Sequence, residues 1–242
     1  MKIIGMLGGM SWQSTAEYYR LANELVRDRL GGLHSARLVL ASVDFAEIEH
    51  LQVTGQWAEA GELLAGVARS LEAAGADFVL VCANTMHKVA DQVEAAVSVP
   101  LLHVADVVAA AVREQDITSI GLLGTAFTME QAFYRDRLAQ HGLDVVVPGT
   151  RDRAEVHRVI YQELCLGQVK EASRQALREI IGRLVVEGAS GVVLGCTELE
   201  LLVRPQDSPV PSFASTQLHV KAAVELALAA DVATGSGCDG RR

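Results

Sequence analysis

A cysteine follows an apolar run in the second half of the chain, where the pattern predicts that a strand passes into a helix. Residues 191–195 read Gly-Val-Val-Leu-Gly, and Cys196 comes next, before Thr197 and Glu198. A sulfur at the first turn of a helix lies beside unpaired N–H groups and the positive end of the helix dipole, which favour a thiolate and lower the thiol pKa. Cys196 is therefore either a reactive thiolate or a buried structural cysteine that packs as a small hydrophobe.

An earlier stretch of the chain repeats this arrangement without a sulfur at the same place. Residues 75–85 match residues 188–198, and in that register Cys196 lies opposite Ala83, not opposite Cys82. Because side chains alternate between the two faces of a strand, Cys82 is expected to point into the core. The chain thus has one thiol where a duplicated site would have two.

The turn that begins at Ala83 carries several polar side chains. Asn84 and Thr85 offer donors suited to holding a carboxylate, and the same two residues also suit ordinary capping of the helix that follows. His87 is either an acid–base group or a histidine on a helix surface. Residues 8–11, Gly-Gly-Met-Ser, could hold an anion at a helix N-terminus, but they do not fit the Gly-x-Gly-x-x-Gly pattern of dinucleotide-binding loops.

The other cysteines and histidines do not have the spacing of a metal site. Cys165 lies in a helical stretch and is expected in the core, and Cys238 lies in the C-terminal tail. No two cysteines have Cys-x-x-Cys spacing. We therefore predict no metal. The histidines without metal-ligand spacing are His34, His50, His103, His141, His157 and His219.

The elements that must position these residues come in two copies. Three further pairs of segments match at nearly the same offset, about 113 residues, which is too long for a solenoid repeat and is the size of one small α/β lobe. The residues at the predicted helix starts have the spacing of a capping box. The pairs are 4–8 with 120–124, Ser14 and Glu17 with Thr128 and Gln131, and 99–100 with 210–211.

Short apolar runs alternate with helical patterns along the chain, which indicates a mostly parallel sheet that binds ligands at the carboxyl ends of its strands. We predict an α/β fold of two pseudo-symmetric lobes, each a mostly parallel sheet flanked by helices, with the active site in the cleft between them. Lobe 1 is expected to comprise 1–100 plus 214–231, lobe 2 101–213, and a flexible tail 232–242. Strands are expected at 2–7, 37–43, 78–81, 101–102, 119–123, 145–147, 192–194 and near 210, and helices at 14–30, 56–74, 128–140, 153–166, 168–187 and 216–230.

Composition restricts the partners and the compartment. The 242 residues are 50% hydrophobic and carry a net charge of −9, without a Lys/Arg cluster interleaved with aromatics, which argues against nucleic acid and against anionic membrane surfaces. The sequence predicts neither a signal peptide nor an apolar span of about 20 residues. We expect a cytoplasmic protein with reduced thiols.

Three motifs together resemble the aspartate/glutamate racemase family, over about residues 1 to 231. Two shorter runs are similar to one branch of that family, the broad-specificity amino-acid racemases. The resemblance implies two α/β lobes with a cleft, no cofactor, an amino acid as the small-molecule substrate, and a homodimer. The three motifs are 7–12 (Leu-Gly-Gly-Met-Ser-Trp), 82–88 (Cys-Ala-Asn-Thr-Met-His-Lys) and 194–198 (Leu-Gly-Cys-Thr-Glu), and the two runs are 31–35 and 163–167.

The mechanism implied by this resemblance uses two cysteines on opposite sides of the substrate α-carbon. A thiolate removes the α-proton from one face and a thiol returns a proton to the other. Cys196 matches the second cysteine. The first position is cysteine in most members and threonine in some of the branch, whereas here it is Ala83, which has no proton to give. Residues that contact substrate in the family match Met10, Gln52, Asn84, Thr85, Thr197 and Glu198.

The leading hypothesis is therefore an isomerase that racemises or epimerises an amino acid without a cofactor, with the Cys196 thiolate as base. A second hypothesis, favoured by Ala83, is a racemase-like protein that binds an amino acid or dicarboxylate without catalysing a reaction. No arginine stands inside the three motifs to hold a side-chain carboxylate, so neutral or hydroxylated amino acids suit the site at least as well as aspartate and glutamate. A third hypothesis, a pyridoxal-phosphate racemase, needs a Schiff-base lysine, for which the chain offers Lys2, Lys88, Lys170 and Lys221.

Overall fold

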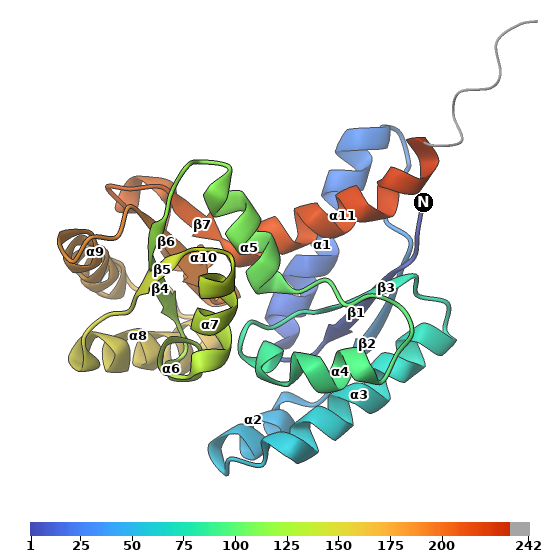
Figure 1. The fold of residues 1–242 in the computed structure, drawn as a ribbon, viewed down its shortest axis with the longest axis horizontal. Coiled ribbons are helices and arrows are strands. Elements are labelled where there is room, and N and C mark those ends of the chain that lie inside the picture. Colours follow the sequence, from blue (N-terminus) through green and yellow to red (C-terminus); the bar gives the residue numbers. More distant parts are fainter. Residues whose placement is uncertain (233–242) are drawn as a thin grey trace, which may run out of the picture. The chain divides into compact units, whose positions relative to one another are not determined.

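The computed structural model describes residues 1–232, which divide into two compact units (Figure 1). Each unit contains one parallel sheet flanked by helices, which confirms the predicted α/β class with two lobes. The lobe boundaries given by the sequence stay a prediction. The tail predicted at 232–242 lies outside the described residues apart from Val232, where the last helix ends. The first unit comprises 1–82, 89–102 and the chain from 220 onward, and the second comprises 83–88 and 103–219.

The first unit is built on three parallel strands in the order β2-β1-β3, and an isolated bridge from Val79 to Leu101 extends the sheet beside β3. Strands β1 and β3 are buried on both faces, so each is a continuous apolar run, and α1 and α11 supply the core on one side. The strands are β1 Ile4–Gly8, β2 Leu38–Ser42 and β3 Phe78–Val81, and the helices are α1 Trp12–Leu30, α2 Phe45–Val53, α3 Trp57–Ala73, α4 Ala90–Ala95 and, from residue 220, α11 Ser215–Val232.

The second unit is built on four parallel strands in the order β5-β4-β6-β7. Its two core clusters involve α8, α9 and α10 in one case and α5 and α7 in the other. The strands are β4 Ser119–Gly124, β5 Asp144–Val146, β6 Gly191–Gly195 and β7 Ser212–Ala214; the helices are α5 Val104–Arg113, α6 Ala126–Glu130, α7 Ala132–Gln140, α8 Thr150–Gln162, α9 Glu171–Val186 and α10 Thr197–Leu202; and short 3-10 turns are η1 Thr85–Val89, η2 Leu164–Leu166 and η3 Pro205–Asp207.

The internal repeat of the sequence reappears in the backbone hydrogen bonds of the two sheets. The Val79 N–H donates to the Pro100 carbonyl over 2.9 Å, and the Val192 N–H donates to the Pro211 carbonyl over 2.9 Å. Gly75 and Gly188 begin the matching strand segments with φ values of 94° and 105°, which glycine adopts without strain. The sequence match therefore reflects a real structural duplication, as predicted.

Two helices begin one turn earlier than the capping-box spacing predicts. Ser11, not Ser14, caps α1, because the Ser14 N–H donates to Ser11 Oγ over 3.2 Å. Thr125 caps α6 in the same way, through a 3.3 Å bond from the Thr128 N–H. Each predicted cap is instead the third helical residue, whose N–H needs a side-chain acceptor.

Two further helices differ from the sequence-based expectation. The helix predicted at 128–140 is divided at Gln131, whose extended backbone (φ −85°, ψ 149°) ends α6 and begins α7. Helix α2 was not among the predicted helices. Only Ile48 and Gln52 are buried in it, so its apolar periodicity is weak, and it is fixed at its start by Asp44, which accepts from the Ala46 N–H over 3.0 Å.

Candidate active site

Cys196 lies in the second unit, directly after β6 and before α10. Its side chain is buried, and its Sγ donates to Glu198 Oε2 over 3.0 Å. Burial, and then the negative charge of Glu198, raise the pKa of this thiol well above its ordinary value. The expectation of a lowered pKa is wrong, because burial disfavours the thiolate and because the six-residue helix α10 carries a carboxylate in contact with the sulfur at its first turn.

This environment gives a prediction for the reactivity of the thiol. Iodoacetamide should alkylate Cys196 slowly at neutral pH and faster as the pH rises, because the thiolate is the nucleophile and a raised pKa leaves little of it. The substitution Glu198→Gln removes the charge that adds to the effect of burial on the pKa. The thiolate fraction should then increase about tenfold for each unit by which the pKa falls, and the rate by about threefold, because a thiolate of lower pKa is a weaker nucleophile. Mass spectrometry of the alkylated peptides measures the rate at Cys196 separately.

Glu200→Gln is the matched control, because it removes an equal charge from the same short helix. Glu200 accepts from the Thr216 N–H over 2.9 Å, whereas Glu198 accepts from the sulfur itself. Alkylation of this variant should change far less than that of Glu198→Gln. Equal rates for the wild type and Glu198→Gln would contradict control of the thiol by Glu198.

Ala83 begins the second unit and is half-buried, whereas Cys82 ends the first unit's segment and is fully buried. Cys82 packs in the same core cluster as Met6 and Leu80, and burial raises the pKa of its thiol far above the ordinary value. The neighbouring positions thus have different environments, as side-chain alternation predicts.

Asn84 and Thr85 are both buried, and their side chains bond within the second unit. Asn84 Nδ2 donates to Ser215 Oγ over 3.0 Å. Thr85 Oγ1 lies 3.0 Å from Thr125 Oγ1 and 3.3 Å from Thr128 Oγ1, so three buried hydroxyls form a triangle. These contacts hold the turn after β3 in a fixed conformation.

Thr197, the residue after Cys196, is tied to the start of α11. Its hydroxyl accepts from Thr216 Oγ1 over 3.1 Å, and both hydroxyl groups are buried. The second unit therefore brings together Asn84, Thr85 and the Cys196–Glu198 segment. Met10 and Gln52 are also buried, but they belong to the first unit.

His87 is buried, and the interpretation as a surface histidine is wrong. The Val104 N–H donates to its Nε2 over 3.3 Å, so Nδ1 carries the proton and donates to the Ala83 carbonyl over 2.8 Å. Burial, and then the neighbouring His103, lower the pKa of His87 well below its ordinary value. A neutral ring with both nitrogens bonded to backbone supports the Ala83 turn and is poorly suited to proton transfer.

The loop Gly8–Ser11 uses its polar groups internally. Gly9 has a φ of 97°, and its N–H donates to Thr15 Oγ1 over 2.8 Å. An added Cβ at Gly9 would lie 2.2 Å from the Val43 carbonyl oxygen, so this backbone passes too close to its neighbour for a side chain. The geometry favours a packing role for these glycines over the predicted anion site.

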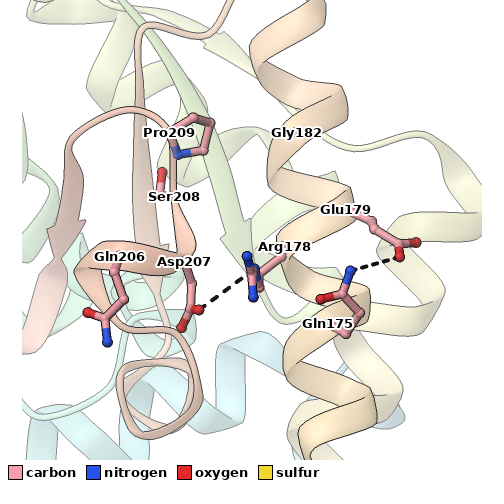
Figure 2. Close-up of a pocket in the computed structure, with 8 residues that line it drawn as sticks. All are labelled: Gln175, Arg178, Glu179, Gly182, Gln206, Asp207, Ser208 and Pro209. Carbon is pink, nitrogen blue, oxygen red and sulfur yellow. Dashed lines mark hydrogen bonds and ion pairs between the residues drawn. The ribbon is translucent and has the colours of Figure 1, made fainter.

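A pocket on the second unit has a volume of about 380 Å³ and lies between α9 and the segment that contains η3 (Figure 2). Figure 2 shows Arg178 directed toward Asp207, with Nε 3.8 Å from Oδ1, and Gln175 bonded to Glu179. None of its eight lining residues belongs to the three motifs. Because none of the candidate substrate residues lines it, and because four of its polar side chains form two pairs with each other, we do not regard it as the amino-acid site.

Tyr134 and Ser215 contact the candidate site residue Asn84, and neither of them was identified from the sequence. The Tyr134 hydroxyl donates to Asn84 Oδ1 over 3.1 Å, and Ser215 accepts from the same amide. The contact from Tyr134 joins residues 50 positions apart, so no local spacing could indicate it. In residues 1–232 we found neither a helix long and apolar enough to cross a membrane nor a group of His, Cys, Asp or Glu side chains able to hold a metal ion.

Two parallel sheets, with polar turns after the buried strands β3 and β6, define an α/β protein with the fold of the two-lobed racemases. The chain belongs to the Asp/Glu/Hydantoin racemase family, whose sequence model matches residues 7–223. Because racemases are isomerases, the chain is an enzyme of that class.

Three known proteins show the range of this similarity. A Yersinia pestis protein of known structure, described as a candidate Asp/Glu racemase, is 54% identical, with a TM-score of 0.89 and coverage of 94% of this chain and 100% of that one. An aspartate racemase homologue from Pyrococcus horikoshii is 36% identical, with a TM-score of 0.83, and the match covers 94% of this chain and 99% of that one. The broad-specificity amino-acid racemase RacX of Bacillus subtilis is 24% identical over 166 residues, which are 66% of this chain and 68% of RacX.

Proposed function

We propose that the protein racemises or epimerises an amino acid without a cofactor, and that Cys196 is the base that removes the α-proton. The observation that carries this proposal is the 3.0 Å contact between the buried Cys196 thiol and the Glu198 carboxylate, in a chain of a racemase family. The described cysteines Cys82, Cys165 and Cys196 are free thiols, which suits a reducing compartment, and we place the enzyme in the cytoplasm.

The contact with Glu198 supports a route by which the thiol becomes a base. The raised pKa of Cys196 keeps its thiol protonated at neutral pH, with the hydrogen directed at Glu198 Oε2. A substrate α-ammonium group beside the sulfur favours the thiolate, because opposite charge stabilises the ionised form. The S–H bond then breaks as an O–H bond forms on Glu198, and the thiolate takes the α-proton to leave a carbanion.

Residue 83 cannot return a proton on the opposite face of the substrate, because it is alanine, so another group must supply that proton. Cys82 is in the core, and both nitrogens of His87 are bonded to backbone. We propose that water supplies this proton through the hydroxyl of Thr85. A relayed proton is a poorer arrangement than a positioned thiol, so turnover is expected to be slow.

The remaining motif residues are proposed to hold the substrate. The side chains of Asn84 and Thr197 and the backbone of Thr85 offer donors for the α-carboxylate, and Met10 and Gln52 provide further contacts. The relatives are described as acting on acidic or on varied amino acids, and neutral or hydroxylated substrates suit the motifs of this chain at least as well as aspartate and glutamate.

The test is an exchange screen in deuterated water. Purified enzyme is incubated with each amino acid, loss of the α-hydrogen signal is followed by NMR, and chiral chromatography measures the enantiomer formed. Exchange with at least one amino acid supports the proposal, and the absence of exchange with all of them contradicts it. Visible absorbance from a pyridoxal Schiff base in the purified protein would contradict cofactor independence.

The alternative function is a racemase-like protein that only binds an amino acid or dicarboxylate, and Ala83 is the feature that favours it. The same screen separates the two, when thermal unfolding is measured alongside exchange. A ligand that raises the melting temperature without any α-hydrogen exchange would support binding without turnover.

We further propose a homodimer that buries an apolar strip on the first unit. Trp12, Tyr19 and Leu40 are exposed there by 67%, 51% and 41%, and they line two neighbouring hollows that share Tyr19. Light scattering should give twice the chain mass of 25.9 kDa for the wild type and a monomer for Tyr19→Glu. Val186→Glu, at an even more exposed apolar position in the second unit, should stay dimeric, and a monomeric wild type would refute the dimer.

A further inference from the structure

A chain of directed hydrogen bonds runs through Asn84 in the second unit. The Tyr134 hydroxyl donates to Asn84 Oδ1 over 3.1 Å, Asn84 Nδ2 donates to Ser215 Oγ over 3.0 Å, and Ser215 Oγ donates to the Leu194 carbonyl over 2.8 Å. The chain joins α7, the turn after β3, the start of α11 and strand β6, two residues before Cys196. All three side chains are buried.

The direction of these bonds fixes the orientation of the Asn84 amide. Ser215 uses its only hydrogen on the Leu194 carbonyl, so it can only accept from Asn84, and the amide nitrogen must face it. The amide oxygen then faces Tyr134, whose hydroxyl must donate. One N–H of the amide is used by Ser215, and the other stays in a fixed direction as a donor for a ligand.

We propose that Tyr134 and Ser215 are positioning residues of the amino-acid site, which together hold the Asn84 amide so that its second N–H is aimed at the substrate carboxylate. This inference rests on the proposed function. Tyr134 itself is fully buried in the core formed with Leu138 and Phe213, so it acts on the substrate through Asn84.

The substitution Tyr134→Phe keeps the ring and removes only the hydroxyl. The amide of Asn84 then loses one of the two hydrogen bonds that hold it in its orientation, and its hydrogen bond to a charged carboxylate is weakened in the ground state and transition state alike. KM should rise about tenfold while kcat stays within about threefold of the wild type. Tyr18→Phe is the matched control, because Tyr18 is a buried tyrosine of the first unit's core, and its KM should be unchanged.

A double-mutant cycle separates positioning from general destabilisation. With Asn84→Ala as background, Tyr134→Phe should have no further effect on KM, because the group through which it acts is gone. An equal increase in both backgrounds, or an unchanged KM in Tyr134→Phe itself, would overturn the proposal. If Tyr134→Phe does not fold, the cycle is repeated with Ser215→Ala, which removes the other partner of the same amide. KM should again rise in the wild-type background and stay unchanged in the Asn84→Ala background.

Failure of the proposed function has a different signature. In that case the wild type exchanges no α-hydrogen, and the cycle is measured with the dissociation constant of the amino acid that raises the melting temperature most. A tenfold weaker Kd in Tyr134→Phe that disappears in the Asn84→Ala background supports positioning even without turnover, and equal weakening in both backgrounds overturns it.

Discussion

Cys196→Ala should lower the rate of α-hydrogen exchange by about 10² to 10⁴-fold, the usual cost of losing a positioned acid–base group. The sulfur is the proposed proton acceptor, and the Glu198 carboxylate that remains would have no route to the α-carbon. Exchange of the α-hydrogen by NMR measures the loss. The rise in melting temperature on adding the amino acid shows whether the site still binds it.

Two variants make this result interpretable. Cys196→Ser keeps the size of the side chain but not its acidity, so it should lose activity while it retains ligand binding. Cys165→Ala removes a half-buried thiol that packs against the same core cluster, and it should stay nearly as active as the wild type. Undiminished exchange in Cys196→Ala would refute the assignment of the base.

Ala83→Cys should have the second largest effect, an increase of at least about tenfold in exchange or racemisation. A positioned acid–base group contributes about 10²-fold or more, although an engineered thiol is rarely placed ideally. Ala83 is half-buried in the second unit, so the new sulfur would not enter the core that surrounds Cys82. Initial rates from each enantiomer, measured by chiral chromatography, give the change.

Cys82→Ala is the control for the register of this turn. It should reduce stability, because a buried side chain is shortened, and leave the rate per folded molecule unchanged. A collapse of activity in Cys82→Ala would mean that Cys82 supplies the proton. An unchanged rate in Ala83→Cys would instead show that residue 83 does not face the substrate.

The sequence predicted the sheets well, because their signal is local. Strand β3 occupies Phe78–Val81 as predicted, since it is a continuous apolar run that begins shortly after the glycine at position 75. The division of one predicted helix at Gln131 was missed because residues on both sides have helical patterns. What interrupts the helix is the extended backbone of one residue, which no periodicity records.

The candidate site was predictable in position but not in its electrostatics. Strand-end turns located Cys196 and Asn84, because the internal repeat aligns Ala83 and Asn84 with Cys196 and Thr197. The pKa of the thiol is raised first by burial and then by the Glu198 carboxylate that turns toward the sulfur, and neither the depth of burial nor a side-chain rotation is recorded in the sequence. Tyr134 was missed for a related reason: a hydrogen bond between distant segments has no spacing rule.

The alanine at position 83 also limits how any asymmetry of this enzyme can be observed. Enantiomers have equal free energy in water, so the ratio of kcat/KM for the two directions must equal one, whatever groups the enzyme has lost. A difference between the acid–base groups on the two faces of the substrate can therefore be observed in only two ways. One is a pair of compensating differences in kcat and KM, and the other is the hydrogen isotope at the α-carbon of the product. In deuterated water, an enantiomer protonated from the Ala83 side would carry solvent deuterium at every turnover. Where the Cys196 thiol instead returns the proton that it has just removed, the starting enantiomer is regenerated and keeps part of its original hydrogen.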